Sequence, residues 1–239
     1  AWQFFYGNGA LAREGVYKNG NKDGVWTGYY NNGIQKDFYT WDNGDLQGDF
    51  KEYNDKGILT REGKFKKDYY NGPVLYYFET GGLDKMQEFD MGTLNGKLEY
   101  YFKNGQKRVE ATFVDGDVDG DVIYYGVNGQ TTQIKTYENG EINGTMKTWY
   151  IDGTLSGEYE YKDGELHGSY KSYHKNGQLR TESEYKEGNT IGKSTSYHEN
   201  GKVESERTFD ETGKESGTTT TYFDDGKVLS THTYRKGEL

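Results

Sequence analysis

The sequence has no cysteine, a single proline and few aliphatic side chains. Without cysteine the chain can form neither disulfides nor thiolate metal sites, and the redox state of its compartment is left open. Only 31% of the 239 residues are apolar, and aromatic residues alone make up 16%. A compact globule of this length normally fills its interior with more Leu, Ile and Val. We therefore expect a thin fold that relies on aromatic rings.

Long apolar runs and basic runs are also missing. No stretch approaches the roughly 18 apolar residues of a membrane helix. The net charge of −10 argues against nucleic acid and anionic membranes as partners. The chain starts at Ala1 without a visible signal peptide, so we expect a removed leader or a trimmed chain. The compartment stays open, with the cell envelope or secretion slightly favoured over the cytoplasm.

What the sequence does contain is an internal repeat of about 24 residues. A glycine recurs at this spacing and divides the sequence into ten repeats, of which the ninth carries one extra residue. The resulting boundaries, within one continuous domain of residues 1–239, are 1–24, 25–48, 49–72, 73–96, 97–120, 121–144, 145–168, 169–192, 193–217 and 218–239.

Three positions of the repeat keep the same residue type in all ten copies. Position five is aromatic, from Phe5 and Tyr29 to Tyr222. Position nine is Gly, from Gly9 to Gly226, and position seventeen is aromatic, from Tyr17 to Tyr234. Such regularity is typical of packing between neighbouring repeats.

Each repeat predicts one β-hairpin. The glycine at position nine usually follows Asn or Asp, and Asn-Gly between aromatic runs favours a two-residue type I′ turn. The second connection, such as residues 139–144, is looser and ends in Gly. Neither connection has room for a helix. We therefore expect an all-β, elongated array of ten antiparallel hairpins that form a twisted or coiled single-layer meander, with a closed barrel or a folded-back sandwich as the alternatives.

The pattern Tyr-Tyr-x-Asn-Gly-x-Leu, followed by Glu, Tyr and a closing Gly, resembles the MORN repeat variants of bacteria. Residues 173–179 with Glu182, Tyr185, Gly188 and Gly192 follow it closely. Asp68 departs from it where Gly is usual, and Gln35 and Lys107 replace the Leu. The resemblance covers the whole chain and implies a role like that of the YwqK-type proteins, which are often labelled antitoxin components. It implies no catalytic residues.

Two short motifs suggest ion or phosphate binding. Residues 115–120, with Asp115, Asp117 and Asp119, match the first half of an EF-hand loop, but Gly126 stands where a bidentate Glu belongs. Whether this loop binds calcium is left open. Residues 188–194 look like a P-loop, but this motif is one residue short and opens a strand. The repeat explains the glycines of both motifs.

No catalytic or metal-binding arrangement emerges from the titratable residues. His174 and His198 share position six of adjacent repeats, which places them roughly 9.6 Å apart, too far for a shared metal. Glu at position fourteen recurs from Glu14 to Glu206 and is interpreted as a solvated face. We expect no enzyme, cofactor or metal.

The faces of the two aromatic columns depend on the hairpin register. A two-residue turn puts positions five and seventeen on opposite faces, whereas a three-residue turn allows them to share one. The sequence leaves both possibilities open.

Candidate binding residues lie where the repeats differ. By the two-residue period of a strand, positions two, four and six share one face. This face is aromatic in the first repeat and in repeats four to six, and mostly polar toward the C-terminus. Something must cover its apolar part: the chain itself, an absent domain or a partner. The predicted partner-binding residues are Trp2, Phe4, Tyr6, Tyr76, Phe78, Tyr100, Phe102 and Tyr124.

The sequence therefore predicts a non-catalytic scaffold that binds another protein, either antitoxin-like or a surface-interaction protein. Tyr and Trp would supply contact area, and acidic loops would steer a basic partner. The alternative is a carbohydrate-binding module of the cell envelope, whose rings would stack on sugars. The oligomeric state is left open.

Overall fold

The protein is represented by a computed structural model that describes residues 1–235 and 237–238. These residues form β-strands joined by turns and contain no helix, so none of them belongs to a membrane-crossing helix. Contacts divide the chain into an N-terminal half, Ala1–Asp117, and a C-terminal half, Val118–Leu239, and each half is described by itself.

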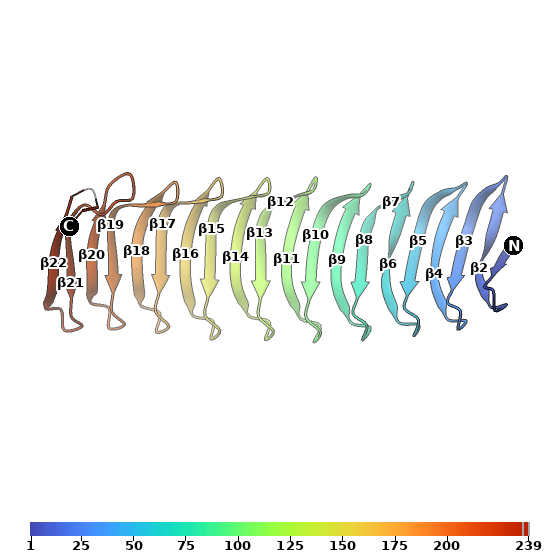
Figure 1. The fold of residues 1–239 in the computed structure, drawn as a ribbon, viewed down its shortest axis with the longest axis horizontal. Coiled ribbons are helices and arrows are strands. Elements are labelled where there is room, and N and C mark those ends of the chain that lie inside the picture. The colour runs from blue at the N-terminus through green and yellow to red at the C-terminus, as the bar shows by residue number, and fades with distance from the viewer. Residues whose placement is uncertain (236, 239) are drawn as a thin grey trace. The chain divides into compact units, whose positions relative to one another are not determined.

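The N-terminal half is a meander of antiparallel strands (Figure 1). Its strands are β1 (Trp2–Phe5), β2 (Leu11–Lys18), β3 (Asn21–Tyr29), β4 (Gln35–Asp42), β5 (Asp45–Tyr53), β6 (Leu59–Lys66), β7 (Tyr69–Tyr70), β8 (Gly72–Tyr77), β9 (Leu83–Asp90), β10 (Thr93–Tyr101) and β11 (Lys107–Val114). The short strand β12 (Asp117–Val118) spans the boundary between the halves.

The C-terminal half repeats the same arrangement in a single layer (Figure 1). Its strands are β13 (Gly120–Tyr125), β14 (Thr131–Glu138), β15 (Glu141–Trp149), β16 (Leu155–Lys162), β17 (Glu165–Tyr173), β18 (Leu179–Lys186), β19 (Asn189–Tyr197), β20 (Val203–Phe209), β21 (Gly217–Tyr222) and β22 (Val228–Tyr234). The all-β fold of antiparallel hairpins in an open meander is thus confirmed.

The first hairpin connection differs from the predicted turn. Tyr30 N–H donates to the carbonyl of Ile34, and Gly33 N–H donates to the carbonyl of Tyr30. This pattern encloses a three-residue loop in which Gly33 has a positive φ of 83° and Asn32 does not. The loop is therefore a type I turn with a glycine bulge, and the type I′ prediction for this Asn-Gly pair is wrong.

The type I′ turn lies instead at the second connection, which we expected to be the looser one. Asn43 and Gly44 have φ values of 49° and 103°, and Asp42 pairs with Asp45 directly across them. Two consecutive residues with positive φ define the type I′ turn. The loose spacing seen in the sequence comes from a bulge at Gly48, because Trp41 pairs with Leu46 while Tyr39 pairs with Phe50.

The hairpin register settles the faces of the aromatic columns. Position two lies opposite position fifteen, as in Trp26 and Tyr39, and position seventeen lies opposite the glycine that closes the preceding repeat. Position five has the opposite parity and points to the other side of the sheet. We call the side of positions two, four, thirteen, fifteen and seventeen the core face, and the side of positions three, five and fourteen the ladder face.

The core face of the N-terminal half buries stacked rings. Trp26, Phe50 and Val74, all at position two, are exposed by 2%, 1% and 0%. Phe50 contacts Tyr39 of the preceding repeat with ring centroids 5.6 Å apart, and Tyr70 contacts Phe89 of the following repeat at 5.4 Å. Such pairs stabilise a sheet by about 0.5–1.5 kcal/mol each beyond the burial of area. A single layer can therefore hold a core, because rings from successive repeats cover one another.

Glycine provides the room that these rings need. A Cβ atom at Gly15 would lie 2.2 Å from Cδ2 of Trp26, so the indole rests directly on the backbone of β2. The indole nitrogen then donates a hydrogen bond to the carbonyl of Val16 at 3.0 Å. Gly15 stands at position fifteen, where Tyr39 and Tyr159 stand in other repeats. A small residue opposite a large one keeps this part of the core face packed.

The ladder face holds a series of hydrogen bonds between tyrosine and glutamate. The hydroxyl of Tyr29 donates to Glu14 at 2.8 Å, and Tyr173 donates to Glu158 at 3.2 Å. The glutamates at position fourteen are thus more than a solvated face, because position five of the next repeat pairs with them. In repeats two, four and six, position fourteen is apolar instead, with Phe38, Met86 and Ile134.

Position six lies just beyond the strand ends. Its side chains join one repeat to the next, because the hydroxyls of Tyr6 and Tyr30 donate to the carbonyls of Tyr29 and Tyr53 at 2.6 and 2.7 Å. His174 Nε2 makes the equivalent contact with the carbonyl of Tyr197 at 2.7 Å. At the C-terminal end, His198 and Phe223 at position six line one hollow with Ser196 and Thr221 at position four, so positions four and six share a side of the sheet there, as predicted.

Candidate binding surfaces

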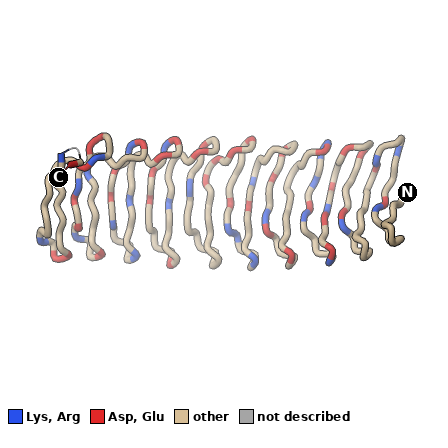
Figure 2. Tube along the Cα trace, viewed as in Figure 1, with Lys and Arg blue, Asp and Glu red and all other residues tan. Residues whose placement is uncertain are grey.

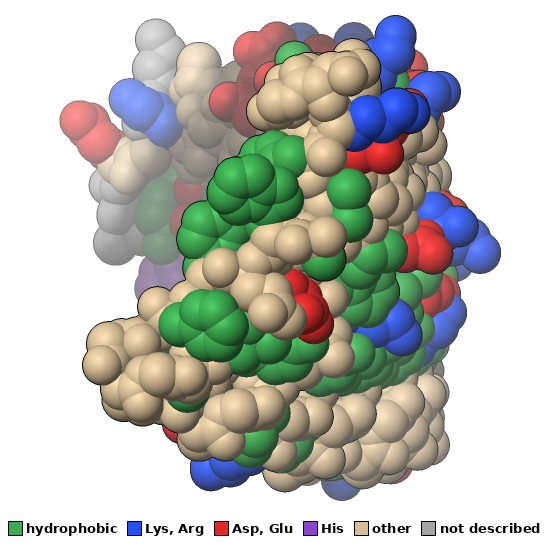
Figure 3. Space-filling model, turned by 90° about the vertical axis from the view of Figure 1, so that its right-hand side faces the viewer, with side chains coloured by type: hydrophobic (Ala, Val, Ile, Leu, Met, Phe, Trp, Pro, Cys, Tyr) green, Lys and Arg blue, Asp and Glu red, His purple; other side chains and the backbone are tan. Residues whose placement is uncertain are grey.

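The first candidate surface is the N-terminal edge, which we define as Trp2, Phe4, Phe5 and Tyr6. These side chains are exposed by 59%, 44%, 59% and 37%. Strand β1 pairs with β2 and, within the described chain, with no other strand of its half. In Figure 3, which looks onto the N-terminal end, hydrophobic side chains gather on the surface that faces the viewer. Three of the predicted residues thus form one exposed aromatic patch.

The second candidate surface is a row of side chains that crosses the strands of the N-terminal half on its core face. Positions four and thirteen face each other in every hairpin, and the same positions pair again between repeats. We call this set the cross-strand row. In strand order its members are Phe4, Arg13, Gly28, Asp37, Glu52, Arg61, Tyr76, Lys85 and Tyr100.

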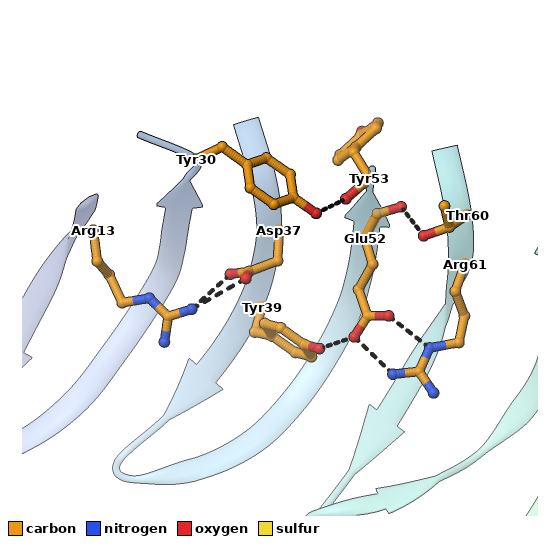
Figure 4. A network of polar contacts seen from close by, with 8 residues as sticks. All are labelled: Arg13, Tyr30, Asp37, Tyr39, Glu52, Tyr53, Thr60 and Arg61. Atoms are coloured by element: carbon orange, nitrogen blue, oxygen red, sulfur yellow. Dashed lines mark hydrogen bonds and ion pairs between the residues drawn. The ribbon is translucent and has the colours of Figure 1, made fainter. Parts of the chain in front are cut away.

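The first charges of the row neutralise one another (Figure 4). Arg13 Nη2 lies 2.9 and 3.1 Å from the two carboxylate oxygens of the buried Asp37. Arg61 makes a two-point contact with Glu52, with Nε–Oε2 at 2.9 Å and Nη2–Oε1 at 2.6 Å. Tyr39 also donates to Glu52. Partly buried arginines with two-point carboxylate contacts are stable structural groups.

Hydrogen bonds tune the charge of Glu52. Burial by itself would raise the pKa of this carboxyl group, but the hydrogen bonds from Arg61 and Tyr39 outweigh burial and hold the pKa below its usual value. The carboxylate therefore stays ionised, and both of its oxygens accept hydrogen bonds from Arg61 or Tyr39.

At Lys85 the row no longer pairs a cation with a carboxylate. This lysine lies directly opposite Tyr76 on one side and Tyr100 on the other, and its Nζ is 3.9 Å from the ring centroid of Tyr76. Arg108, one repeat further on, lies 5.2 Å above the ring of Tyr100. Among the described residues, neither cation has a carboxylate within ion-pair distance, and neither tyrosine hydroxyl has a hydrogen-bond partner.

The predicted residues Phe78 and Phe102 stand at position six of these same two repeats and are partly exposed. They lack the polar atom with which Tyr6 or His174 binds the next repeat. Tyr76, Phe78, Tyr100 and Phe102 thus come from adjacent repeats of the N-terminal half. Tyr124 belongs to the C-terminal half, where Lys135 Nζ lies 5.7 Å from its ring centroid.

The corresponding row of the C-terminal half carries mainly hydroxyl groups. Ser196 and Ser205 are hydrogen-bonded at 2.8 Å, and Thr221 and Ser230 at 2.7 Å. The predicted change from an aromatic to a polar face is thus visible in the paired residues. These hydroxyls satisfy one another, whereas Lys85 and Arg108 have no such partner.

The remaining motifs have local roles. Asp115 and Gly116 form a turn with φ values of 51° and 98°, and Asp115 accepts a hydrogen bond from Asn95 at 3.1 Å. In the described part of the chain, no group of three or more His, Cys, Asp or Glu side chains is placed to hold a metal ion. Lys and Arg are interspersed with Asp and Glu along both halves (Figure 2).

Five segments of the chain match the family model described as MORN repeat variant. They are residues 1–19, 94–115, 166–187, 191–214 and 215–236. These segments are similar to MORN-variant repeats. The resemblance inferred from the sequence is confirmed to this extent, while a bacterial source and the antitoxin label stay predictions. A comparison with curated proteins finds no match.

Similar solved structures include the crystal structures of TcdB2-TccC3 and of TcdB2-TccC3-Cdc42. The sequence identities are 12% and 11%, and the TM-scores are 0.22 and 0.20. Each match covers 98% of this chain, which spans only 16% of the length of the matched chains. These TM-scores are too low to indicate a common fold.

Sequence reasoning missed the two cations Lys85 and Arg108. A signal was present, because position thirteen is basic in three of the first four repeats, as Arg13, Arg61 and Lys85. Only the register shows that the first two are neutralised by carboxylates and the third is not.

Proposed function

We propose that this protein is a non-catalytic repeat scaffold that binds another protein through the aromatic surface of its N-terminal half. The observation that carries the proposal is the N-terminal edge, where the side chains of Trp2, Phe4 and Tyr6 reach solvent. Aromatic anchors supply much of the energy in protein interfaces because they bury large areas at a low entropic cost.

The repeat type supports the same proposal. MORN-variant segments suggest a repeat-based binding scaffold rather than a reaction centre. Many of the described titratable groups pair within or between neighbouring repeats, as Glu52 does with Arg61 and Glu14 does with Tyr29. Catalysis requires groups with unequal environments in a concave site. The regular ladder does not offer such an arrangement.

The test is affinity capture from the protein's own source with a matched pair of variants. The double variant Trp2→Ser/Phe4→Ser removes two exposed rings of the edge. Ile151→Ser is the control, because Ile151 lies in a turn of the C-terminal half and is 83% exposed. We expect one protein to be retained by the wild type and by Ile151→Ser and lost from the double variant.

Native mass spectrometry of the captured complex then defines the kind of partner. An antitoxin-like scaffold holds a single toxin in a stable complex, whereas a surface-interaction protein captures a host or envelope protein. Equal capture by all three proteins contradicts the proposal. Binding of a glycan in place of a protein also contradicts it and favours the carbohydrate-binding alternative.

A further inference from the structure

We infer that Tyr76, Lys85 and Tyr100 of the cross-strand row, together with the adjacent Arg108, bind the carboxylates of a short acidic segment of a partner protein. The inference rests on the proposed function, because it names the chemistry of the partner. It concerns a surface on β8 to β11, which is distinct from the N-terminal edge on β1.

The incomplete charge pairing of the row points to this ligand. Arg13 and Arg61 each have a carboxylate within 3 Å, at Asp37 and Glu52. Lys85 lies in the same row but rests on the ring of Tyr76, and the nearby Asp84 makes no ion pair with it. Burial lowers the pKa of Lys85, which shows that its ammonium group has lost part of its hydration. A carboxylate from outside would replace that hydration with a charge-assisted hydrogen bond.

The tyrosines add two donors beside the two cations. The hydroxyls of Tyr76 and Tyr100 have no hydrogen-bond partner within the described residues, whereas Tyr39 and Tyr77 donate to glutamates of their own sheet. A phenol hydroxyl is a good donor to a carboxylate. The four groups together match an anion that accepts several hydrogen bonds and lies against aromatic rings.

The spacing of the cations selects an extended peptide. Lys85 belongs to β9 and Arg108 to β11, and strands two apart in a sheet are separated by about 9.6 Å. A polyproline-II segment is extended, rises by about 3.1 Å per residue and has three residues per turn, so carboxylates three residues apart lie on one side, about 9.3 Å apart, and reach both cations. The acidic loops elsewhere on the chain, with its net charge of −10, repel a uniformly acidic protein. The occupant is therefore a short acidic segment.

The experiment uses the full chain and two synthetic peptides of equal length. One peptide carries two glutamates three residues apart, and the other carries glutamines at those places. We expect the glutamate peptide to bind more tightly at low salt and to weaken as salt is added. The double variant Lys85→Gln/Arg108→Gln is expected to weaken this binding by roughly tenfold or more, because it removes both charge-assisted contacts.

The matched control is Arg180→Gln. Arg180 stands at position twelve of its repeat, as Arg108 does, but Ser172 replaces tyrosine at the neighbouring position four. Binding by Arg180→Gln should equal that of the wild type. Tyr76→Phe and Tyr100→Phe should each weaken binding without a change in the thermal unfolding of the N-terminal half, because these hydroxyls bind nothing within the described chain.

Three outcomes would overturn the inference: equal binding of both peptides, equal losses in Arg180→Gln and in the double variant, or binding of heparin or an oligonucleotide at these residues in place of the peptide. The proposed function fails separately. In that case no protein depends on Trp2 and Phe4 for capture, while the glutamate peptide still depends on Lys85 and Arg108.

Discussion

The hydroxyl of Tyr29 donates a hydrogen bond to the carboxylate of Glu14 at 2.8 Å, across the junction between the first two repeats. The same contact recurs with the same spacing of 15 residues between Tyr197 and Glu182 at 2.5 Å. Tyr77, Tyr173 and Tyr222 make the same contact with Glu62, Glu158 and Glu206. Each such bond links a hairpin to its neighbour, which is the interaction on which a repeat array depends.

Removal of one hydroxyl of this ladder should destabilise the chain. We expect Tyr197→Phe to lower the free energy of unfolding by about 1–2 kcal/mol, because it leaves the Glu182 carboxylate without this donor. Urea unfolding followed by circular dichroism measures the change. Tyr53→Phe is the matched control, since Phe38 stands where the glutamate would be and the Tyr53 hydroxyl loses no carboxylate. Equal losses in both variants would show that the ladder bonds contribute nothing specific.

The same ladder predicts how stability depends on pH. The hydrogen bond from Tyr77, followed by that from Lys51, holds the pKa of Glu62 below its ordinary value of 4.5. A lowered carboxyl pKa contributes stability above the unfolded pKa, and this contribution disappears as pH falls through the folded pKa. Burial and the bond to Glu62 raise the pKa of Tyr77 to about 12. A raised phenol pKa contributes stability below pH 10, and the contribution disappears as pH rises toward 12.

We therefore expect the melting temperature to fall below about pH 4.5 and again above about pH 10. Differential scanning fluorimetry over this range measures both limbs. Glu62→Gln should flatten the dependence at both ends, because it removes the carboxyl group and the charge that raises the Tyr77 pKa. An unchanged acid limb in this variant would assign the acid sensitivity to other carboxyl groups.

How much of this could be predicted from the sequence depends on which interactions carry the information. The repeat and its strands follow from aromatic columns that recur every 24 residues, because a period is visible without coordinates. The sequence assigned the type I′ turn to the wrong connection of the repeat. Asn32-Gly33 and Asn43-Gly44 are the same dipeptide, and only the closing hydrogen bonds distinguish their turns. The opposition of Lys85 to both Tyr76 and Tyr100 depends on bulges in the two hairpin strands, which no residue pattern revealed.

His174 tests whether position six requires a hydrogen-bonding side chain or merely a ring. Its Nε2 meets the carbonyl of Tyr197, where Tyr150 presents its hydroxyl to the carbonyl of Tyr173 at 2.8 Å. We expect His174→Tyr to change the free energy of unfolding by less than about 0.5 kcal/mol and His174→Phe to lower it by about 1 kcal/mol. Chemical unfolding of the two variants measures both changes in the free energy of unfolding. Indistinguishable variants would assign the contribution of position six to packing.

The last prediction concerns Asp68, the residue that departs from glycine in a type I′ turn. Its φ of 68° is costly for a side chain other than Gly or Asn, by about 1 kcal/mol. The same side chain accepts a hydrogen bond from Leu46 N–H at 2.7 Å, which is worth about 0.5–1.5 kcal/mol. Asp68→Gly relieves the backbone and loses this bond, so the two effects should nearly cancel. Asp68→Asn keeps an acceptor oxygen and tolerates the left-handed conformation better, so it should raise the free energy of unfolding by several tenths of a kcal/mol. If urea unfolding showed a full gain of about 1 kcal/mol for Asp68→Gly and none for Asp68→Asn, the bond to Leu46 would contribute nothing, and backbone strain alone would determine the stability of this turn.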